Sequence, residues 1–562
     1  MDIFKIHNVL FIVKVFDRVR QNIMKKRGTV YLIIIGLWIG ALTVLGFALF
    51  NIIKGINETN VIKYISIIIL LVINTLVLGI LWLGSIKDFI FSLTYAFKHK
   101  KLEKEYQKIK DVEISKENEP RVLLLYCTCN DFNPSALFKS SRQDYSNFKV
   151  VILDDSTKNE YISLINKYKF QHSNVEVIRR KDHTGYKAGN LNNYLTGRDD
   201  YDYFVVLDSD EVIPQDYIKK VLKYFNYDPN CGAVQAKHKA LKGKNVFQDL
   251  MGMCVNSNGT TVQVVKNFYD ANALIGHGMT ISKECYIKTK GFPLVVAEDI
   301  SFAVEIKNVN LNIIYAPDIE CYEEFPIDYV SLKKRQCKWT QGNLEYMRKY
   351  DKDINHSKMK WFEKMDIKLS HYSLPIVPIL SLLLTICTIG LGFLGYPIIR
   401  YSLTIYLIMI LFLCSPMIPD LFVYQRTKNV FLLIPYFIIN IMTYASLSPM
   451  MLKTIFLGLF GKKATFIVTP KDSKKFTLKE IFKYSYDSII FALIIGALAL
   501  LSCGSILPVI FIVVGCLGAP LIILLANISL EKKPKIKEKE QKVEIIEPRK
   551  KIFNTCEIVI KR

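Results

Sequence analysis

The chain has 562 residues, of which 51% are hydrophobic and 22% are charged. This length exceeds what one hydrophobic core supports, and the apolar fraction is high for a soluble protein, so the composition excludes a small soluble domain and predicts membrane segments. The 74 Lys and Arg against 51 Asp and Glu give a formal net charge of +23. Because the basic residues gather beside apolar runs, we assign them to contact with anionic lipid and expect no nucleic-acid partner.

Six apolar runs are long enough to cross a bilayer, which takes about 20 helical residues. Lys25 and Lys26 precede the first run, and Lys98 and Lys100 follow the second. Since positive residues stay on the cytoplasmic side, we expect a multi-pass protein of the plasma membrane with both termini and its large polar segment in the cytoplasm. We interpret the first run as a retained anchor, because a cleavable signal has a shorter apolar core. The runs are residues 29–52, 61–84, 371–394, 401–423, 486–503 and 506–527.

A further apolar stretch, residues 427–460, contains Pro435 and Pro449. One crossing there would move the following lysines, among them Lys462, to the other side of the membrane. We therefore expect helices that lie at the cytoplasmic interface, or that dip into the bilayer and return. The predicted domains are 1–94 (N-terminus and two spans), 95–365 (cytoplasmic α/β domain), 366–426 (interfacial segment and two spans), 427–482 (interfacial helices and a loop), 483–528 (two spans) and 529–562 (basic cytoplasmic tail).

Within the polar segment, four apolar runs rich in β-branched residues alternate with helix-like sequence, which predicts a parallel sheet with right-handed crossovers. Ligands of such sheets bind beyond the carboxyl ends of the strands. Thr128 follows the first predicted strand, Asp154 and Asp155 follow the second, and Asp208 and Asp210 follow the fourth. Each of these residues could also serve as a helix cap or lie in a solvated turn. The predicted strands are residues 121–126, 148–153, 175–178 and 203–207.

The segment Lys187-Ala188-Gly189-Asn190-Leu191-Asn192 follows the third predicted strand. Its small residues and its lysine are typical of a helix N-terminus that binds an anion, because free backbone amides and the helix dipole favour negative charge there. Alone it indicates only a capped helix. Between the Asp154-Asp155 pair and the Asp208-x-Asp210 motif, it indicates a nucleotide-sugar site.

With these motifs the chain resembles glycosyltransferase family 2, and within it the membrane-embedded processive synthases of the cellulose, hyaluronan and mixed-linkage glucan type. The resemblance implies a GT-A type α/β nucleotide-sugar-binding domain embedded in an α-helical transmembrane bundle. It implies that Asp154 and Asp155 bind uracil and ribose, and that Lys187 contacts the diphosphate. Asp208 and Asp210 would coordinate Mg²⁺ or Mn²⁺, and Thr128 would join the nucleotide-sugar site.

Further along the chain, Ala297-Glu298-Asp299 occupies the position of the family's Thr-Glu-Asp motif. The resemblance implies that Asp299 is the general base that deprotonates the acceptor hydroxyl, with Glu298 near the acceptor. Gly276-His277-Gly278 begins a segment that lies near the acceptor in the family. The role of His277 stays open, since it could act as a base but Asp299 is better suited.

Two more motifs complete the resemblance. Arg335, Lys338 and Trp339 stand where the family has Gln-x-x-Arg-Trp, which implies contacts of the two cations with the leaving group and of the indole with the acceptor sugar. Phe466-Ile467-Val468-Thr469-Pro470-Lys471 matches the gating loop of cellulose-synthase-like enzymes, which implies that Thr469 and Lys471 approach the diphosphate.

The function implied is processive, inverting polymerisation of glucose from UDP-glucose into a mixed-linkage β-1,3/1,4 glucan or cellulose, secreted through the enzyme's own transmembrane channel. The partners are then UDP-glucose, the growing glucan and the bilayer, and no partner subunit can be identified. One alternative is a non-processive transferase that adds a hexose to a lipid, and another is a hyaluronan- or chitin-like synthase. A third is a transporter or lipid-binding protein with a degenerate domain.

Overall fold

The computed structural model describes residues 28–114, 119–397, 399, 401–425, 431, 433–461 and 475–530. All structural statements below concern these residues. The predicted gating loop, with Thr469 and Lys471, lies outside them, as do residues 1–27 and 531–562.

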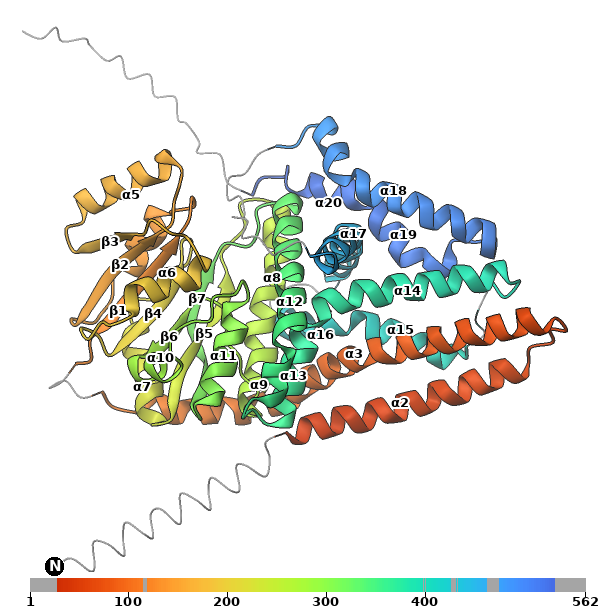
Figure 1. The fold of residues 1–562 in the computed structure, drawn as a ribbon, viewed down its shortest axis with the longest axis horizontal. Coiled ribbons are helices and arrows are strands. Elements are labelled where there is room, and N and C mark those ends of the chain that lie inside the picture. Colours follow the sequence, from red (N-terminus) through yellow and green to blue (C-terminus); the bar gives the residue numbers. More distant parts are fainter. Residues whose placement is uncertain are drawn as a thin grey trace, which may run out of the picture.

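A mixed seven-stranded sheet forms the centre of the polar part of the chain, in the order β3-β2-β1-β4-β6-β5-β7 (Figure 1). The four predicted strands are present and run parallel to one another, and β1, β2 and β4 bury apolar side chains on both faces. β6 pairs antiparallel with β4 and β5, and β5 pairs parallel with β7. The strands are β1 (Val122–Thr128), β2 (Phe148–Asp154), β3 (Val175–Arg179), β4 (Tyr203–Asp208), β5 (Cys231–Ala240), β6 (Met279–Ser282) and β7 (Asn312–Glu323).

Helices cover both faces of this sheet. Alternate residues of each strand point to opposite faces and pack against the helices there. Leu123 and Leu125 pack with the core beneath α6 and α11, whereas Leu124 and Tyr126 pack with the core beneath α4, α5 and α7. The α/β fold class is therefore confirmed. These helices are α4 (Pro134–Ser140), α5 (Asn159–Gln171), α6 (Tyr186–Leu195), α7 (Tyr217–Tyr227), α8 (Val246–Thr260), α9 (Val262–Phe268), α10 (Lys283–Lys288) and α11 (Glu298–Asn308).

Seven helical segments of the described residues are long and apolar enough to cross a membrane, by length and composition. The chain is thus membrane-embedded, with one candidate span more than the six expected. The additional candidate is α17, which lies in the stretch predicted to be interfacial. The segments are α2 (Thr29–Lys54), α3 (Val61–Lys110), α14 (Ser373–Phe393), Leu403–Tyr424 (α15, Leu403–Cys414; η1, Ser415–Met417; α16, Ile418–Tyr424), α17 (Leu433–Leu459), α18 (Leu478–Cys503) and Leu507–Leu525 (η3, Leu507–Val509; α19, Ile510–Leu517; α20, Ala519–Leu525).

Helix α17 is continuous, so the expected interruption at its two prolines does not occur. Pro435 lies in the first turn, where no intrahelical N–H bond is lost, and Pro449 is accommodated inside the helix. Figure 1 shows α17 end-on, whereas α2, α3, α14 and α18 run lengthwise across the view. This crosswise direction favours an interfacial position for α17, and that position remains a prediction.

The sheet domain joins the apolar helices through α12 (Tyr329–His356) and α13 (Trp361–His371). Phe247 of α8, Leu332 of α12, Leu447 of α17 and Ile522 of α20 share one buried apolar cluster. Helix α3 also continues from the apolar bundle along the sheet domain (Figure 1). There Asn267 donates to the Tyr106 hydroxyl at 3.0 Å, so the two parts pack directly against each other.

A buried ionic cluster lies at the junction of α3, α9 and α13. The Asp366 carboxylate is fully buried and contacts Lys266 Nζ at 2.5 Å and Lys87 Nζ at 3.5 Å. Burial alone would raise the pKa of Asp366, but the two ammonium groups outweigh it and lower the pKa. We call Lys87, Lys266 and Asp366 the junction cluster.

Candidate active site

The Asp208-x-Asp210 motif forms a tight turn at the carboxyl end of β4. Strand register places Cys127 of β1 beside Asp208, and Thr128 beside Asp154 of β2, so the polar strand ends meet at one edge. The Asp208 side chain is 41% exposed, and Asp210 Oδ2 accepts the Glu324 amide at 3.2 Å. Two accessible carboxylates at a strand end form a donor set that suits Mg²⁺ or Mn²⁺.

Asp131 holds the Asp208-x-Asp210 turn in place through two hydrogen bonds. Its Oδ1 accepts the Thr128 hydroxyl at 2.8 Å, and its Oδ2 accepts the Ser209 hydroxyl at 2.7 Å. The predicted nucleotide-sugar residue Thr128 is therefore buried and engaged in holding the loop. Asp131 was not among the predicted site residues, although its position after a strand end could have indicated it.

Lys187 connects three parts of the edge. Helix α6 begins at Tyr186 after Gly185, whose φ of 74° lies in the left-handed region. Lys187 Nζ donates to the Asp208 carboxylate and, at 2.8 Å, to the Gly276 carbonyl. Burial alone would lower the pKa of Lys187, but the nearby carboxylates, Asp208 first, outweigh it and raise the pKa. The lysine is therefore fully cationic at the predicted diphosphate position.

The two aspartates after β2 are paired with two arginines at the end of β3. Arg180 binds Asp155 through two bonds, Nε to Oδ1 at 2.9 Å and an Nη to Oδ2 at 2.6 Å. Arg179 Nε donates to Asp154 Oδ2 at 2.5 Å. Arg180 also donates to the Tyr186 carbonyl at 2.7 Å and so links the aspartate pair to the helix that carries Lys187. Neither arginine was among the predicted site residues.

Glu298 and Asp299 lie in the first turn of α11, next to the loop that contains Gly276. A Cβ at Gly276 would lie 3.4 Å from Asp299 Oδ2, so the loop backbone passes close to this carboxylate. Burial and the neighbouring Asp299 charge raise the pKa of Glu298 to about 7, and burial also raises the pKa of Asp299. A carboxyl group whose pKa lies near neutrality is suited to proton transfer.

Helix α12 presents Arg335, Lys338 and Trp339 at the helical spacing of one face. The Arg335 guanidinium lies 4.5 Å from the Phe325 ring and 4.6 Å from the Trp339 ring. Burial lowers the pKa of Lys338, opposed first by the charge of Asp208, so this lysine faces the acidic edge. Trp339 is 44% exposed, which leaves indole surface for a sugar ring.

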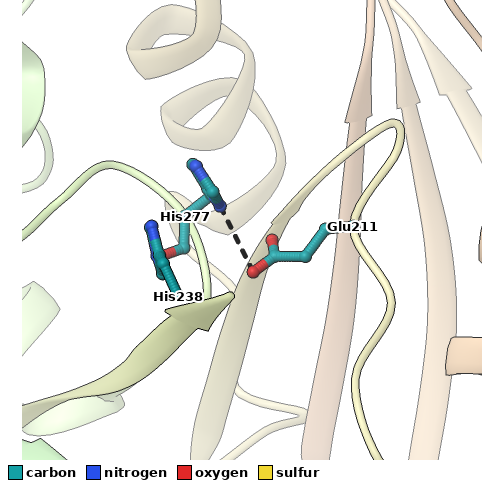
Figure 2. Close-up of side chains that lie close together, drawn as sticks. All are labelled: Glu211, His238 and His277. Atoms are coloured by element: carbon teal, nitrogen blue, oxygen red, sulfur yellow. Dashed lines mark hydrogen bonds and ion pairs between the residues drawn. The ribbon is translucent and has the colours of Figure 1, made fainter. Parts of the chain in front are cut away.

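Among the described residues, Glu211, His238 and His277 form one group whose ligand atoms could hold a metal ion (Figure 2). The two imidazole rings stack with centroids 4.1 Å apart and planes 19° apart. Since a metal ion binds in the plane of an imidazole along its nitrogen lone pair, two stacked rings are poorly placed to share one ion. We interpret the group as an ion-pair cluster, and Asp208 and Asp210 remain the predicted ligands of a divalent ion.

Residues 203–444 match the family model described as glycosyl transferase family group 2. This part of the chain is thus similar to the glycosyltransferases of family 2. The match includes Asp208, Asp210, Glu298, Asp299 and the α12 residues, so the family resemblance predicted from the motifs is confirmed.

Two curated relatives are similar to this chain over less than half of its length. Glucans biosynthesis glucosyltransferase H of Shewanella sp. strain W3-18-1 is 26% identical over 272 residues, which are 43% of this chain and 37% of the relative. A protein of Arabidopsis thaliana named "probable glucomannan 4-beta-mannosyltransferase 15" is 23% identical over 289 residues, 47% of this chain and 52% of the relative. The chain thus spans about half, or less, of the curated relatives it matches.

Solved structures resemble this chain more distantly. The mannosyltransferase PcManGT from Pyrobaculum calidifontis, solved with GDP-Man and Mn²⁺, aligns with a TM-score of 0.41 and 18% identity, covering 67% of this chain and 100% of that protein. Staphylococcus aureus TarS aligns with a TM-score of 0.33 and 16% identity, covering 55% of this chain and 53% of TarS.

Proposed function

We propose that this chain is a processive, inverting β-glycosyltransferase that polymerises glucose from UDP-glucose into a β-glucan, either mixed-linkage β-1,3/1,4 glucan or cellulose. The observation that carries the proposal is the convergence at Gly276. Its carbonyl accepts a bond from Lys187, Lys187 also binds Asp208, and the same glycine lies against Asp299. A cation for a diphosphate, a carboxylate for a metal ion and a carboxyl group for proton transfer are thereby held at one strand edge.

The donor end of the site lies toward β1, β2 and β3. Asp154 and Asp155, with Thr128 beneath them, would bind the uridine, and their arginine partners fix the carboxylates in place. Lys187 would hold the diphosphate. Asp208 and Asp210 would hold the Mg²⁺ or Mn²⁺ ion, which would neutralise charge on the departing nucleotide.

Proton transfer is assigned to the carboxylates of α11. Asp299 takes the proton from the acceptor hydroxyl, and that oxygen bonds to the anomeric carbon of glucose from the face opposite the leaving group. The bond from this carbon to the phosphate oxygen breaks, and UDP leaves with the electron pair. Lys187, Lys338 and Arg335 stabilise its charge, whereas Glu298 orients the acceptor. One inversion follows from one displacement, so no covalent enzyme intermediate is needed.

Processivity and secretion are proposed from the position of α12 and the apolar helices. Trp339 lies on α12, between the sheet domain and the bundle, where it would stack on the terminal sugar of the growing chain. A polar polymer needs a lined path through hydrocarbon, which the candidate spans between residues 371 and 527 could form around it. We place the protein in the plasma membrane with the site in the cytoplasm, because basic residues flank the spans on that side.

The deciding experiment supplies radiolabelled UDP-glucose, and in parallel GDP-mannose, to the full-length protein in detergent with Mg²⁺ or Mn²⁺. Insoluble polymer from UDP-glucose that lichenase cuts to short oligosaccharides establishes a mixed-linkage glucan. Polymer resistant to lichenase but cut by β-1,4-glucanase establishes cellulose. Label found only in the lipid phase contradicts processivity, and label from GDP-mannose alone contradicts the donor assignment.

Asp299→Asn is the inactive variant for this assay. Asp199→Asn is its matched control, because the Asp199 side chain is 96% exposed and pairs only with Lys283 in the salt bridges of the described chain. We expect UDP release to fall by at least about 10²-fold in the first variant and to stay at the wild-type rate in the second. Equal activity of the two variants would contradict the assignment of the base.

A further inference from the structure

His277 lies between two glutamates on two separate segments. Its Nδ1 is 3.2 Å from Glu211 Oε1, and its Nε2 is 3.0 Å from Glu323 Oε2. Glu211 is completely buried, and the side chains of His277 and Glu323 are 16% and 17% exposed. Figure 2 shows the His277 ring directed at Glu211, with His238 stacked beside it. Both ring nitrogens thus face carboxylates, so neither is directed at an acceptor hydroxyl.

Glu211 carries this contact to the metal-binding turn. Its Oε2 accepts the backbone N–H of Asp208 at 3.2 Å and that of Gly278 at 3.1 Å. Gly278 has a φ of 58°, and a Cβ there would lie 2.6 Å from Glu211 Oε1. Only glycine fits this approach, so the loop and the turn are in direct contact.

The other end of the same loop holds the diphosphate lysine. Gly276, with a φ of 90°, turns its carbonyl to Lys187 Nζ at 2.8 Å. Residues 276–278 therefore join the Asp208 turn to Lys187, and His277 is the side chain in the middle of that connection. A shift of this residue would displace both groups together.

Charge explains why a histidine is used there. Two buried carboxylates repel each other and need a cation between them. Burial would lower the pKa of His277, but Glu211, Asp208 and Glu323 outweigh it and raise the pKa. Contact with His277 lowers the pKa of Glu323 to about 2, against the effect of its burial. His238, whose pKa is lowered by burial and by His277, contributes a neutral ring against the charged one.

We propose that His277 is a positioning residue: it holds Glu211 and Glu323 together and thereby fixes the Asp208 turn and the Gly276 carbonyl that orients Lys187. This inference rests on the proposed function, because it assigns Asp208 and Lys187 to the metal ion and the diphosphate. It departs from a role of His277 as the base, because both ring nitrogens lie within ion-pair distance of a carboxylate.

The test compares His277→Gln, Glu211→Gln and the double variant His277→Gln/Glu211→Gln in full-length protein. UDP affinity with Mn²⁺ is measured by calorimetry, which needs no turnover, and kcat and KM for UDP-glucose are measured separately. His277→Gln leaves two buried carboxylates without a cation, so we expect UDP affinity to fall by about 10- to 100-fold, the usual range for loss of a supporting residue at a metal site. The double variant removes one charge and should recover most of this loss. His356→Gln, an exposed histidine on α12, is the matched control and should match the wild type.

Each outcome decides between the explanations. Wild-type UDP affinity and turnover in His277→Gln would overturn the positioning role and leave the proposed function standing. Unchanged UDP affinity with a large fall in kcat and a lost limb of the pH profile would also overturn it, since His277 would then act in proton transfer. Equal losses in the single and double variants would refute the charge explanation, and the double variant keeps the test valid if His277→Gln does not fold. Failure of the wild type to bind UDP with Mn²⁺ would overturn the proposed function and this inference together.

Discussion

Two regions of the molecule bury charge in opposite balance. In the junction cluster one carboxylate, Asp366, lies between the ammonium groups of Lys87 and Lys266. At the strand edge that carries Asp208, the proposed catalytic edge, two adjacent carboxyl groups, Glu298 and Asp299, are buried together. Lys187 acts on both, with Lys338 near Glu298 and His277 near Asp299.

The contrast shows that burial does not decide the protonation of a carboxyl group by itself. Burial raises the pKa in both places, but excess positive charge reverses it for Asp366, whereas the neighbouring carboxylate adds to it for Glu298. Where two cations face one carboxylate, as at Asp366, the carboxylate stays ionised and the ion pairs stabilise the packing of the helices. A carboxyl group whose pKa is raised toward neutrality can both accept and release a proton near neutral pH, which suits it to proton transfer.

The largest expected effect is on the catalytic side of this comparison. Asp299→Asn removes the proposed base without changing side-chain size, and we expect kcat for glucose transfer to fall by about 10²- to 10⁴-fold. UDP binding should be unchanged, which calorimetry checks. A fall in kcat of less than about tenfold would contradict the assignment of Asp299 as the base, and both regions would then have only a structural role.

Removing the cation of the catalytic edge should be the next largest effect. Lys187→Met abolishes the bonds to Asp208 and to the Gly276 carbonyl, and kcat/KM for UDP-glucose should fall by about 10²- to 10³-fold. Steady-state kinetics with varied UDP-glucose measures it. A lysine of comparable exposure without a role at the edge, Lys283, gives the control Lys283→Met, whose kinetics should stay at the wild-type values.

The junction cluster should respond in stability rather than in turnover. Asp366→Asn leaves two buried ammonium groups without their carboxylate, which costs about 3 kcal/mol of unfolding free energy. We expect a lower Tm in detergent and an unchanged KM for UDP-glucose at a temperature where the variant is folded. An unaltered Tm would show that the cluster is not a stabilising contact between α3, α9 and α13.

The smallest effect concerns pH. Asp299 must be ionised to accept a proton, so the rate should fall as the pH drops through the pKa of Asp299, which burial raises above its usual value. Glu298→Gln removes the repelling charge, so the remaining carboxyl group should ionise more easily and the limb should move to lower pH. Measuring kcat between pH 5 and 9 tests this, and a limb that stays in place would assign the titration to another group.

The sequence predicted the elements whose physical cause is local. The four strands follow from apolar β-branched runs, and the meeting of Lys187 with Asp208 follows from strand ends that share an edge. The resemblance to a known family implied the role of Asp299, which stays a prediction. In each case the prediction follows from a short stretch of neighbouring residues.

Contacts between distant segments could not be predicted in this way. The pairing of Arg180 with Asp155 depends on the register of β2 and β3, and the link from Glu211 through His277 to Glu323 depends on three separate segments. Continuity of α17 across Pro449 depends on packing that supports the helix where a bond is lost. No local pattern encodes these arrangements.

Helix α3 gives the enzyme a mechanical property. Its 50 residues form one rod, about 75 Å long at 1.5 Å per residue, that begins among the apolar helices and ends beside the sheet domain, where Lys223 donates to the Lys110 carbonyl at 2.6 Å. Because α3 is one continuous helix, a change in the tilt of one end also changes the tilt of the other. A thicker or thinner bilayer that tilts the apolar end of α3 would therefore act on the sheet domain, so the acyl-chain length of the surrounding lipid becomes a variable of the proposed activity.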